Sequence, residues 1–225
     1  MHIDIWSDVA CPWCYLAVRH LRQALSAFAE KDKVTVRLHA YFLQPELTGV
    51  DERSEAQYLA QTKGMTIPEV NAALEAVSAL GAKEGIRFDW ENVKVASTTN
   101  AHRLICLARE IDVENDTTTG PDTLELKVHE ALGRARFEYG MNLANPESLL
   151  ALASDFQIDT ERVFAALESQ TYANEVFSDF QIGVQMGVNA VPVFIFDNAY
   201  LVEGAQPTAA FQNILQTAWN HSHSE

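Results

Sequence analysis

Two cysteines three residues apart, Cys11 and Cys14, stand near the start of the chain. They follow an alternating apolar run over residues 2–6, which predicts a strand, and they precede an apolar pattern of helical period. Residues i and i+3 of a helix lie about 5–6 Å apart, within the Cα range that a disulfide spans. The spacing and its place therefore predict a pair of thiols that opens and closes a disulfide.

The two thiols are expected to have different roles. Cys11 would lie at the start of the helix, where free backbone N–H groups and the positive end of the helix dipole stabilise a thiolate. We predict Cys11 as the nucleophile and Cys14, one turn further and shielded, as the resolving thiol that attacks the mixed disulfide. Pro12 suits the first helical turn, and Trp13 would pack beside the sulfurs and help to set their redox potential.

Two alternatives to a redox pair remain. A zinc site would require two further ligands, but the sequence has no second CxxC and no HxxxH, and the third cysteine, Cys106, stands alone. We therefore predict no metal site, and we expect Cys106 to be a core residue. Two ordinary buried cysteines are the second alternative, which the position of the pair at a strand-to-helix junction disfavours.

The periodicity predicts an α/β fold with a helical insertion. The first strand, the helix and a second alternating run over residues 34–42 form a βαβ unit, so these two strands should be parallel. From residue 46 to about 171 the pattern is that of successive helices. It then returns to strands over 191–196 and 199–202, joined by a turn at Asp197-Asn198, and to a last helix. We expect one discontinuous α/β domain, residues 1–48 and 173–225, interrupted by an all-helical domain, residues 49–172.

Pro192 lies in the apolar run that predicts the later strand. A proline removes one donor from a sheet ladder, so this position favours a sheet edge, a strand start or a cis peptide bond. A cis Val191–Pro192 bond would leave the backbone of Val191 free to pair with an extended substrate segment. We therefore predict Val191 and Pro192 as substrate-binding residues opposite the two cysteines.

Charge and hydropathy exclude several classes of partner. The formal net charge of -15 repels polyanions, so neither nucleic acid nor an anionic membrane is expected to bind. No stretch approaches the roughly 18 consecutive apolar residues of a membrane span, and the first strand follows Met1 without a signal-peptide pattern. A close cysteine pair without a larger disulfide framework is typical of a reducing compartment. We therefore expect a cytoplasmic protein.

Four segments together resemble a known family: residues 8–16, 100–104, 187–194 and 204–207. They are similar to the FrnE-type branch of the DsbA family of thiol-disulfide oxidoreductases, and the resemblance runs essentially from end to end. It implies a thioredoxin fold with a large inserted all-helical domain, a nucleophilic Cys11, a resolving Cys14 and a cis Pro192. Many relatives carry asparagine where this chain has Ser97, so the resemblance does not imply a ligand contact at that position.

Other proteins of the same fold provide alternative functions. Kappa-class glutathione transferases and 2-hydroxychromene-2-carboxylate isomerases resemble this chain but usually carry serine where Cys11 stands. The presence of both cysteines favours dithiol exchange over conjugation or isomerisation. A glutathione-dependent transferase, an isomerase and a chaperone-like binding module are the alternatives.

We expect a dithiol-disulfide oxidoreductase that acts on protein or small-molecule thiols and disulfides. No metal or organic cofactor is required for this chemistry, and glutathione or a thioredoxin-like partner would reset the pair. His102 and Arg103 are candidates for the groove that faces the cysteines, with a partly buried structural histidine as the alternative. Asp8 is a candidate proton acceptor for Cys14, with a loop or capping role as the alternative.

Overall fold

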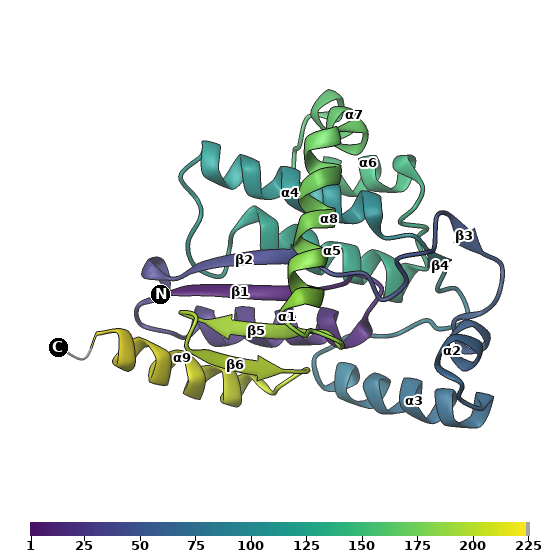
Figure 1. Cartoon of the computed structure of the whole chain (residues 1–225), viewed down its shortest axis with the longest axis horizontal. Coiled ribbons are helices and arrows are strands. Elements are labelled where there is room, and N and C mark those ends of the chain that lie inside the picture. The colour runs from purple at the N-terminus through teal and green to yellow at the C-terminus, as the bar shows by residue number, and fades with distance from the viewer. Residues whose placement is uncertain (224–225) are drawn as a thin grey trace.

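A four-stranded sheet lies at the centre of the computed structural model, which describes residues 1–223 (Figure 1). The strands have the order β2-β1-β5-β6. Their bounds are β1 (His2–Ser7), β2 (Thr35–Ala40), β5 (Val193–Phe196) and β6 (Tyr200–Glu203). β1 and β2 are parallel, as the βαβ pattern predicts, whereas β5 is antiparallel to both β1 and β6. The first and last parts of the chain therefore share one sheet.

Local chemistry explains the two connections that shape this sheet. Helix α1 (Pro12–Ser26) joins β1 to β2 and begins with proline, which needs no hydrogen-bond partner there. Asp197 and Asn198 join β5 to β6 with φ values of 47° and 55°. Aspartate and asparagine tolerate this left-handed region, so the tight turn predicted between the last strands is confirmed.

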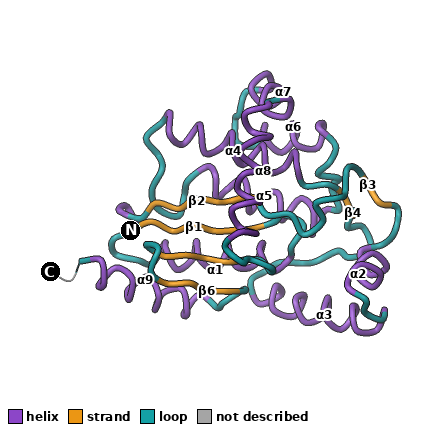
Figure 2. The backbone as a smooth tube through the Cα atoms, in the orientation of Figure 1, coloured by secondary structure: helices purple, strands orange, loops and turns teal. Residues whose placement is uncertain are grey.

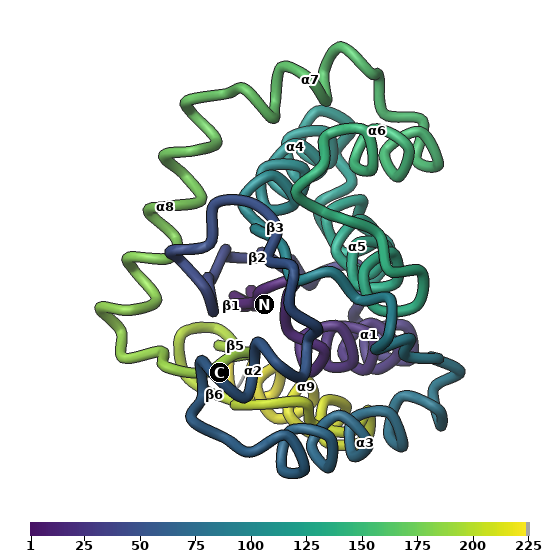
Figure 3. Tube along the Cα trace, turned by 90° about the vertical axis from the view of Figure 1, so that its right-hand side faces the viewer, coloured from purple at the N-terminus to yellow at the C-terminus, as the bar shows by residue number. Residues whose placement is uncertain are grey.

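Helices cover both faces of the sheet. α8 (Gln170–Gln185) crosses one face, and α1 lies on the opposite face with α9 (Thr208–Ser222) packed beside it (Figures 1 and 3). The remaining helices are α2 (Glu55–Lys63), α3 (Ile67–Lys83), α4 (Thr99–Glu114), α5 (Leu124–Tyr139), α6 (Pro146–Ser154) and α7 (Thr160–Glu168). A two-stranded pair, β3 (Val50–Asp51) and β4 (Val95–Ala96), lies outside the main sheet (Figure 2). The sequence pattern does not predict this pair, because two-residue strands are too short to show alternation.

Capping residues start several of the inserted helices. Ser54 with Gln57 at α2, and Thr66 with Glu69 at α3, each form a capping box in which side chains and backbone N–H groups bond reciprocally. Gly64 ends α2 in the left-handed conformation at φ 65°. These local signals set the ends of α2 and the start of α3.

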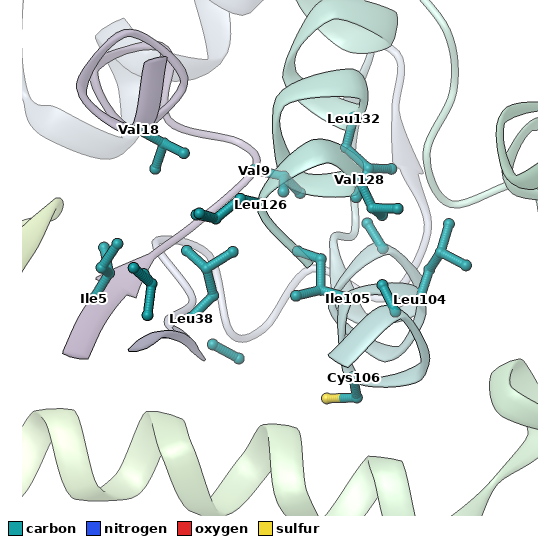
Figure 4. Packing of buried hydrophobic residues seen from close by; sticks show 14 of the residues in the cluster. Ile5, Val9, Val18, Leu38, Leu104, Ile105, Cys106, Leu126, Val128 and Leu132 are labelled. Carbon is teal, nitrogen blue, oxygen red and sulfur yellow. The ribbon is translucent and has the colours of Figure 1, made fainter. Parts of the chain in front are cut away.

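One buried apolar cluster joins the sheet to the inserted helices. It contains Ile5 of β1 and Leu38 of β2 together with Leu104 of α4 and Leu132 of α5 (Figure 4). Cys106 lies at the edge of this cluster and is 5% exposed, as expected for a core residue (Figure 4). The cluster holds α4 and α5 against the end of β1, where the loop that leads to Cys11 begins.

The buried carboxyl of Glu125 on α5 makes stability depend on pH. Burial raises the pKa of Glu125 to about 7, although the positive charge of Arg109 and the hydrogen bond from the N–H of Leu38 both act to lower it. An unfolded glutamate has a pKa of about 4.3, so between these values the folded state binds the extra proton and stability falls as pH rises. Glutamine does not titrate, so raising the pH from 5 to 8 should destabilise wild type but not Glu125→Gln. The stability of the variant relative to wild type should therefore increase by about 2–3 kcal/mol over this range. Urea unfolding at both pH values measures this, and an identical difference at the two would contradict it.

Candidate active site

The antiparallel pairing of β1 and β5 sets the geometry of the site. Trp6 near the end of β1 pairs with Val193 at the start of β5. The residues that follow β1 therefore lie beside those that precede β5. The Val191–Pro192 peptide bond is cis in the structure. The sheet thus brings Cys11 and Val191 together, although 180 positions separate them.

Cys11 occupies the N-cap position of α1. Its backbone is extended, and its carbonyl accepts from the N–H groups of Cys14 at 3.1 Å and Tyr15 at 3.2 Å. Its thiol makes no capping bond and instead donates to the carbonyl oxygen of Val191, with 3.6 Å between sulfur and oxygen. The first turn of α1 carries no acidic residue. A thiolate at Cys11 would therefore meet the positive end of the helix with no competing carboxylate on that turn.

Cys14 is fully buried one turn into α1. Burial raises the pKa of the Cys14 thiol well above its usual range, and the neighbouring Cys11 adds to the effect. Hydrogen bonds from the Ser7 side chain and the Asp8 backbone oppose it. All three cysteines are free thiols in this structure, and burial favours the neutral form of the Cys14 thiol.

Asp8 is a buried carboxylate held by several donors. It accepts from the N–H of Ala10 at 3.0 Å and of Leu43 at 2.8 Å, and His102 Nε2 lies 3.4 Å from its Oδ1. Burial alone would raise the pKa of Asp8, but His102 and these two N–H groups outweigh it and lower the pKa. Asp8 therefore shapes the loop before Cys11 and provides a buried negative charge beside His102.

The other predicted residues have different surroundings in the structure. Pro12 and Trp13 are half-buried, and Trp13 packs on an aromatic cluster that includes Phe137 of α5. The His102 side chain is buried and lies edge-on to Phe42. Arg103, in contrast, donates from its guanidinium to the carbonyl of Leu167 on α7, so we do not include it in the proposed site.

Ser7 and His129 are site residues that the sequence pattern does not indicate. Ser7 is the last residue of β1, and His129 lies on α5, 122 positions later, with 2.7 Å between Ser7 Oγ and His129 Nε2. Both side chains are buried. No motif marks either residue, because their contact depends on how α5 packs on the end of β1.

Trp6 connects the site to α8. Its ring stacks on His39 with 4.3 Å between centroids, and its Nε1 donates to the carbonyl of Asp179 at 3.1 Å. A Cβ placed on Gly183 would lie 2.6 Å from Trp6 Cδ1, so only glycine allows α8 to approach this closely. With Tyr41 and Val193, Trp6 forms a small apolar cluster onto which Val191 packs.

We expect Gly183→Ala to weaken both stability and activity. Overpacking against the Trp6 ring costs about 1–3 kcal/mol, more than the gain of up to about 1 kcal/mol from replacing a helical glycine. Disulfide exchange should slow because Trp6 positions Val193 and the segment before it. Thermal unfolding and a disulfide-reduction assay measure the two effects. Gly49→Ala is the matched control, since a Cβ placed there meets nothing within 4 Å, and equal behaviour of the two variants would contradict the expectation.

The described residues carry neither a metal cluster nor a membrane span. Within residues 1–223, no three His, Cys, Asp or Glu side chains gather where a metal ion would bind. In the same range, no helix has the length and apolar character needed to cross a bilayer.

Comparison with protein families identifies the class. Residues 2–216 match the DSBA-like thioredoxin domain, so the chain belongs to this family, and the predicted thioredoxin fold with its helical insertion is confirmed. The resemblance to the DsbA family is likewise confirmed, and with it an enzyme of the dithiol-disulfide oxidoreductase class. None of the curated proteins compared with the chain matches it.

Solved structures agree with this family. The chain is 32% identical to a probable DsbA oxidoreductase from Streptomyces coelicolor, with a TM-score of 0.83 over 98% of this chain and 90% of that one. The cytosolic disulfide reductase DsbM from Pseudomonas aeruginosa, solved with GSH, is 16% identical with a TM-score of 0.64, covering 98% of this chain and 100% of DsbM. A 2-hydroxychromene-2-carboxylate isomerase is 14% identical with a TM-score of 0.62, covering 100% and 98% of the two chains. At these lower identities the likeness is one of fold.

Proposed function

We propose that this protein exchanges disulfides through Cys11 and Cys14, with Cys11 as the nucleophile and Cys14 as the resolving thiol. The contact between the Cys11 thiol and the Val191 carbonyl carries the proposal, because it places the first turn of α1 against the segment that precedes β5. The substrate would lie along Val191, next to Pro192, with its disulfide within reach of Cys11.

The burial of the two thiols supports this division of roles. Cys11 is 5% exposed at the end of a helix, whereas Cys14 has no exposed surface at all. A disulfide that approaches this end of α1 would therefore meet Cys11 before Cys14. Cys14 then needs only to reach a sulfur already bound to Cys11, one helical turn away.

The same chemistry defines the expected partners. Protein or small-molecule disulfides would be the substrates, and glutathione or a thioredoxin-like protein would return the pair to its starting state. The structure of DsbM with GSH supports glutathione as a partner, and the cytosolic location in its name supports a cytoplasmic place for this chain. Neither thiol step requires a metal or an organic cofactor.

Trapping of the intermediate tests the proposal. In Cys14→Ala, a protein disulfide such as that of insulin should remain covalently bound to Cys11, because no second thiol releases it. Non-reducing electrophoresis followed by peptide mass spectrometry identifies the linked cysteine. Cys106→Ala is the matched control and should trap no adduct. An adduct on Cys106, or none on Cys11, contradicts the proposal and favours the transferase or isomerase alternative, which saturable glutathione binding would then test.

A further inference from the structure

We propose that Ser7 and His129 form a proton relay for Cys14, completed by one water in a buried cavity and ending at the His102–Asp8 pair. The inference rests on the proposed function, since it explains how the buried resolving thiol loses its proton. It adds two residues, Ser7 and His129, that no sequence motif marks.

The need for a relay follows from where Cys14 lies. The thiolate is the species that attacks a disulfide, but Cys14 is sealed from solvent and its neutral form is favoured by burial. The Ser7 side chain lies next to the Cys14 thiol and opposes the rise of its pKa. The Ser7 hydroxyl is in turn 2.7 Å from His129 Nε2. A row of neighbouring polar side chains, Ser7 and then His129, therefore leads from the thiol to an imidazole.

The path continues into a small polar cavity. Its volume is about 10 Å³, at the lower limit of the space that holds one water. Its polar lining residues are Ser7, His39, His102, Cys106, His129 and Asp179. Within residues 1–223, His129 Nδ1 and His102 Nε2 are buried nitrogens without a hydrogen-bond partner, although Asp8 faces the latter at 3.4 Å. Because unpaired buried polar groups are costly, a water between the two imidazoles would satisfy both.

Of the other polar groups around the cavity, His39 and Asp179 are already hydrogen-bonded. His39 bonds to Asp179 through Nδ1 at 2.8 Å and to Asp4 through Nε2 at 2.7 Å. Burial raises the pKa of the Cys106 thiol to about 12, so it stays protonated. Among the lining residues, His129 and His102 therefore offer the nitrogens that a water in this cavity would bind.

The two histidines would act differently. Burial lowers the pKa of His129 to about 3, so His129 is neutral at working pH. A neutral imidazole carries a proton by accepting it at Nε2 while releasing another from Nδ1. His102 would be the acceptor at the end of the path, because its Nε2 lies 3.4 Å from the buried carboxylate of Asp8.

Protons and electrons balance in the direction that closes the disulfide. The Cys14 proton passes to Ser7 Oγ, the Ser7 proton to His129 Nε2, and the His129 Nδ1 proton through the water to His102. The Cys14 sulfur then bonds to the Cys11 sulfur, and the bond between Cys11 and the substrate sulfur breaks. The substrate sulfur leaves with the electron pair, so the substrate disulfide is reduced and the cysteine pair is oxidised. The reverse step returns the proton to Cys14.

Stopped-flow reaction with 5,5′-dithiobis(2-nitrobenzoate) separates the two thiol steps. Attack by Cys11 releases one coloured thiolate in a phase that depends on reagent concentration, and closure by Cys14 releases a second in a first-order phase. We expect Ser7→Ala and His129→Gln to slow the second phase at pH 7 at least tenfold and to leave the first within twofold. In these variants, the rate of the second phase should increase about tenfold per pH unit, because hydroxide replaces the relay as the proton acceptor. This dependence on pH should be steeper than in wild type.

Two controls and one fallback make the test decisive. The Ser7→Ala/His129→Gln double variant should be no slower than either single variant, because both interrupt one path. Cys106→Ala, which changes the same cavity outside the relay, should keep the wild-type profile. Ser7→Ala decides the result if His129→Gln fails to fold, as circular dichroism would show.

Two results would overturn the relay. One is a second phase that keeps the wild-type rate and pH profile in the variants. The other is slowing by the same factor at every pH, which indicates altered packing alone. A wild-type protein without the first phase would instead overturn the proposed function, so the two failures are distinguishable.

Discussion

Cys11→Ser is expected to reduce the rate of disulfide exchange to the uncatalysed background, a loss of at least about 1000-fold. Serine cannot form a disulfide with the substrate, and Cys14 is too deeply buried to replace Cys11. The fold should persist, because the Cys11 side chain makes no capping bond to α1. Reduction of insulin by glutathione, with and without the protein, measures the loss.

Cys106→Ser is the matched control for this substitution. Cys106 is also buried, but it lies on α4 at the edge of the apolar cluster and outside the proposed exchange. Its replacement should lower stability while leaving the exchange rate near that of wild type. Activity that survives Cys11→Ser would remove the basis of the proposed function.

Glu55→Ala is expected to destabilise the protein by about 3–5 kcal/mol. Glu55 at the start of α2 pairs with Arg136 of α5, with 3.0 Å between carboxylate oxygen and guanidinium nitrogen. The two side chains are only 4% and 1% exposed. Removal of the carboxylate leaves the Arg136 charge buried without its ionic partner, and urea unfolding measures the cost.

An exposed pair provides the comparison. Glu114 meets Arg162 at 2.8 Å, but the two side chains are 49% and 38% exposed, so Glu114→Ala should cost no more than about 1 kcal/mol. Replacing both buried partners, as in Glu55→Met/Arg136→Met, should recover much of the stability lost in Glu55→Ala. Equal losses for Glu55→Ala and Glu114→Ala would show that burial does not amplify this interaction.

The features that could be predicted from sequence are those encoded locally. Alternation marks β1 and β2, proline marks the start of α1, and Asp197-Asn198 marks the last hairpin. The four resembling segments add the inserted helices between the two parts of the sheet. Each of these signals lies within a few residues of the element that it specifies.

The surroundings of Cys14 could not be predicted, because they depend on side chains that meet only in the folded protein. Ser7 and His129 lie 122 positions apart, and neither has a neighbouring motif. The sequence predicts His102 as a possible groove residue, but it does not show that His102 lies behind Asp8, away from the surface. Arg103, its neighbour on α4, points to α7 for the same reason, since adjacent helical residues face different directions.

Equilibration with glutathione is the sharpest test of a dithiol couple at Cys11 and Cys14. The protein is incubated over a series of reduced-to-oxidised glutathione ratios, quenched with acid and alkylated, and each cysteine is then quantified by peptide mass spectrometry. We predict that Cys11 and Cys14 oxidise together as one two-electron couple, that any glutathione adduct lies on Cys11, and that Cys106 stays reduced. The midpoint also gives the reduction potential and hence the favoured direction. Independent oxidation of Cys11 and Cys14, or an adduct on Cys14, would contradict the proposed exchange.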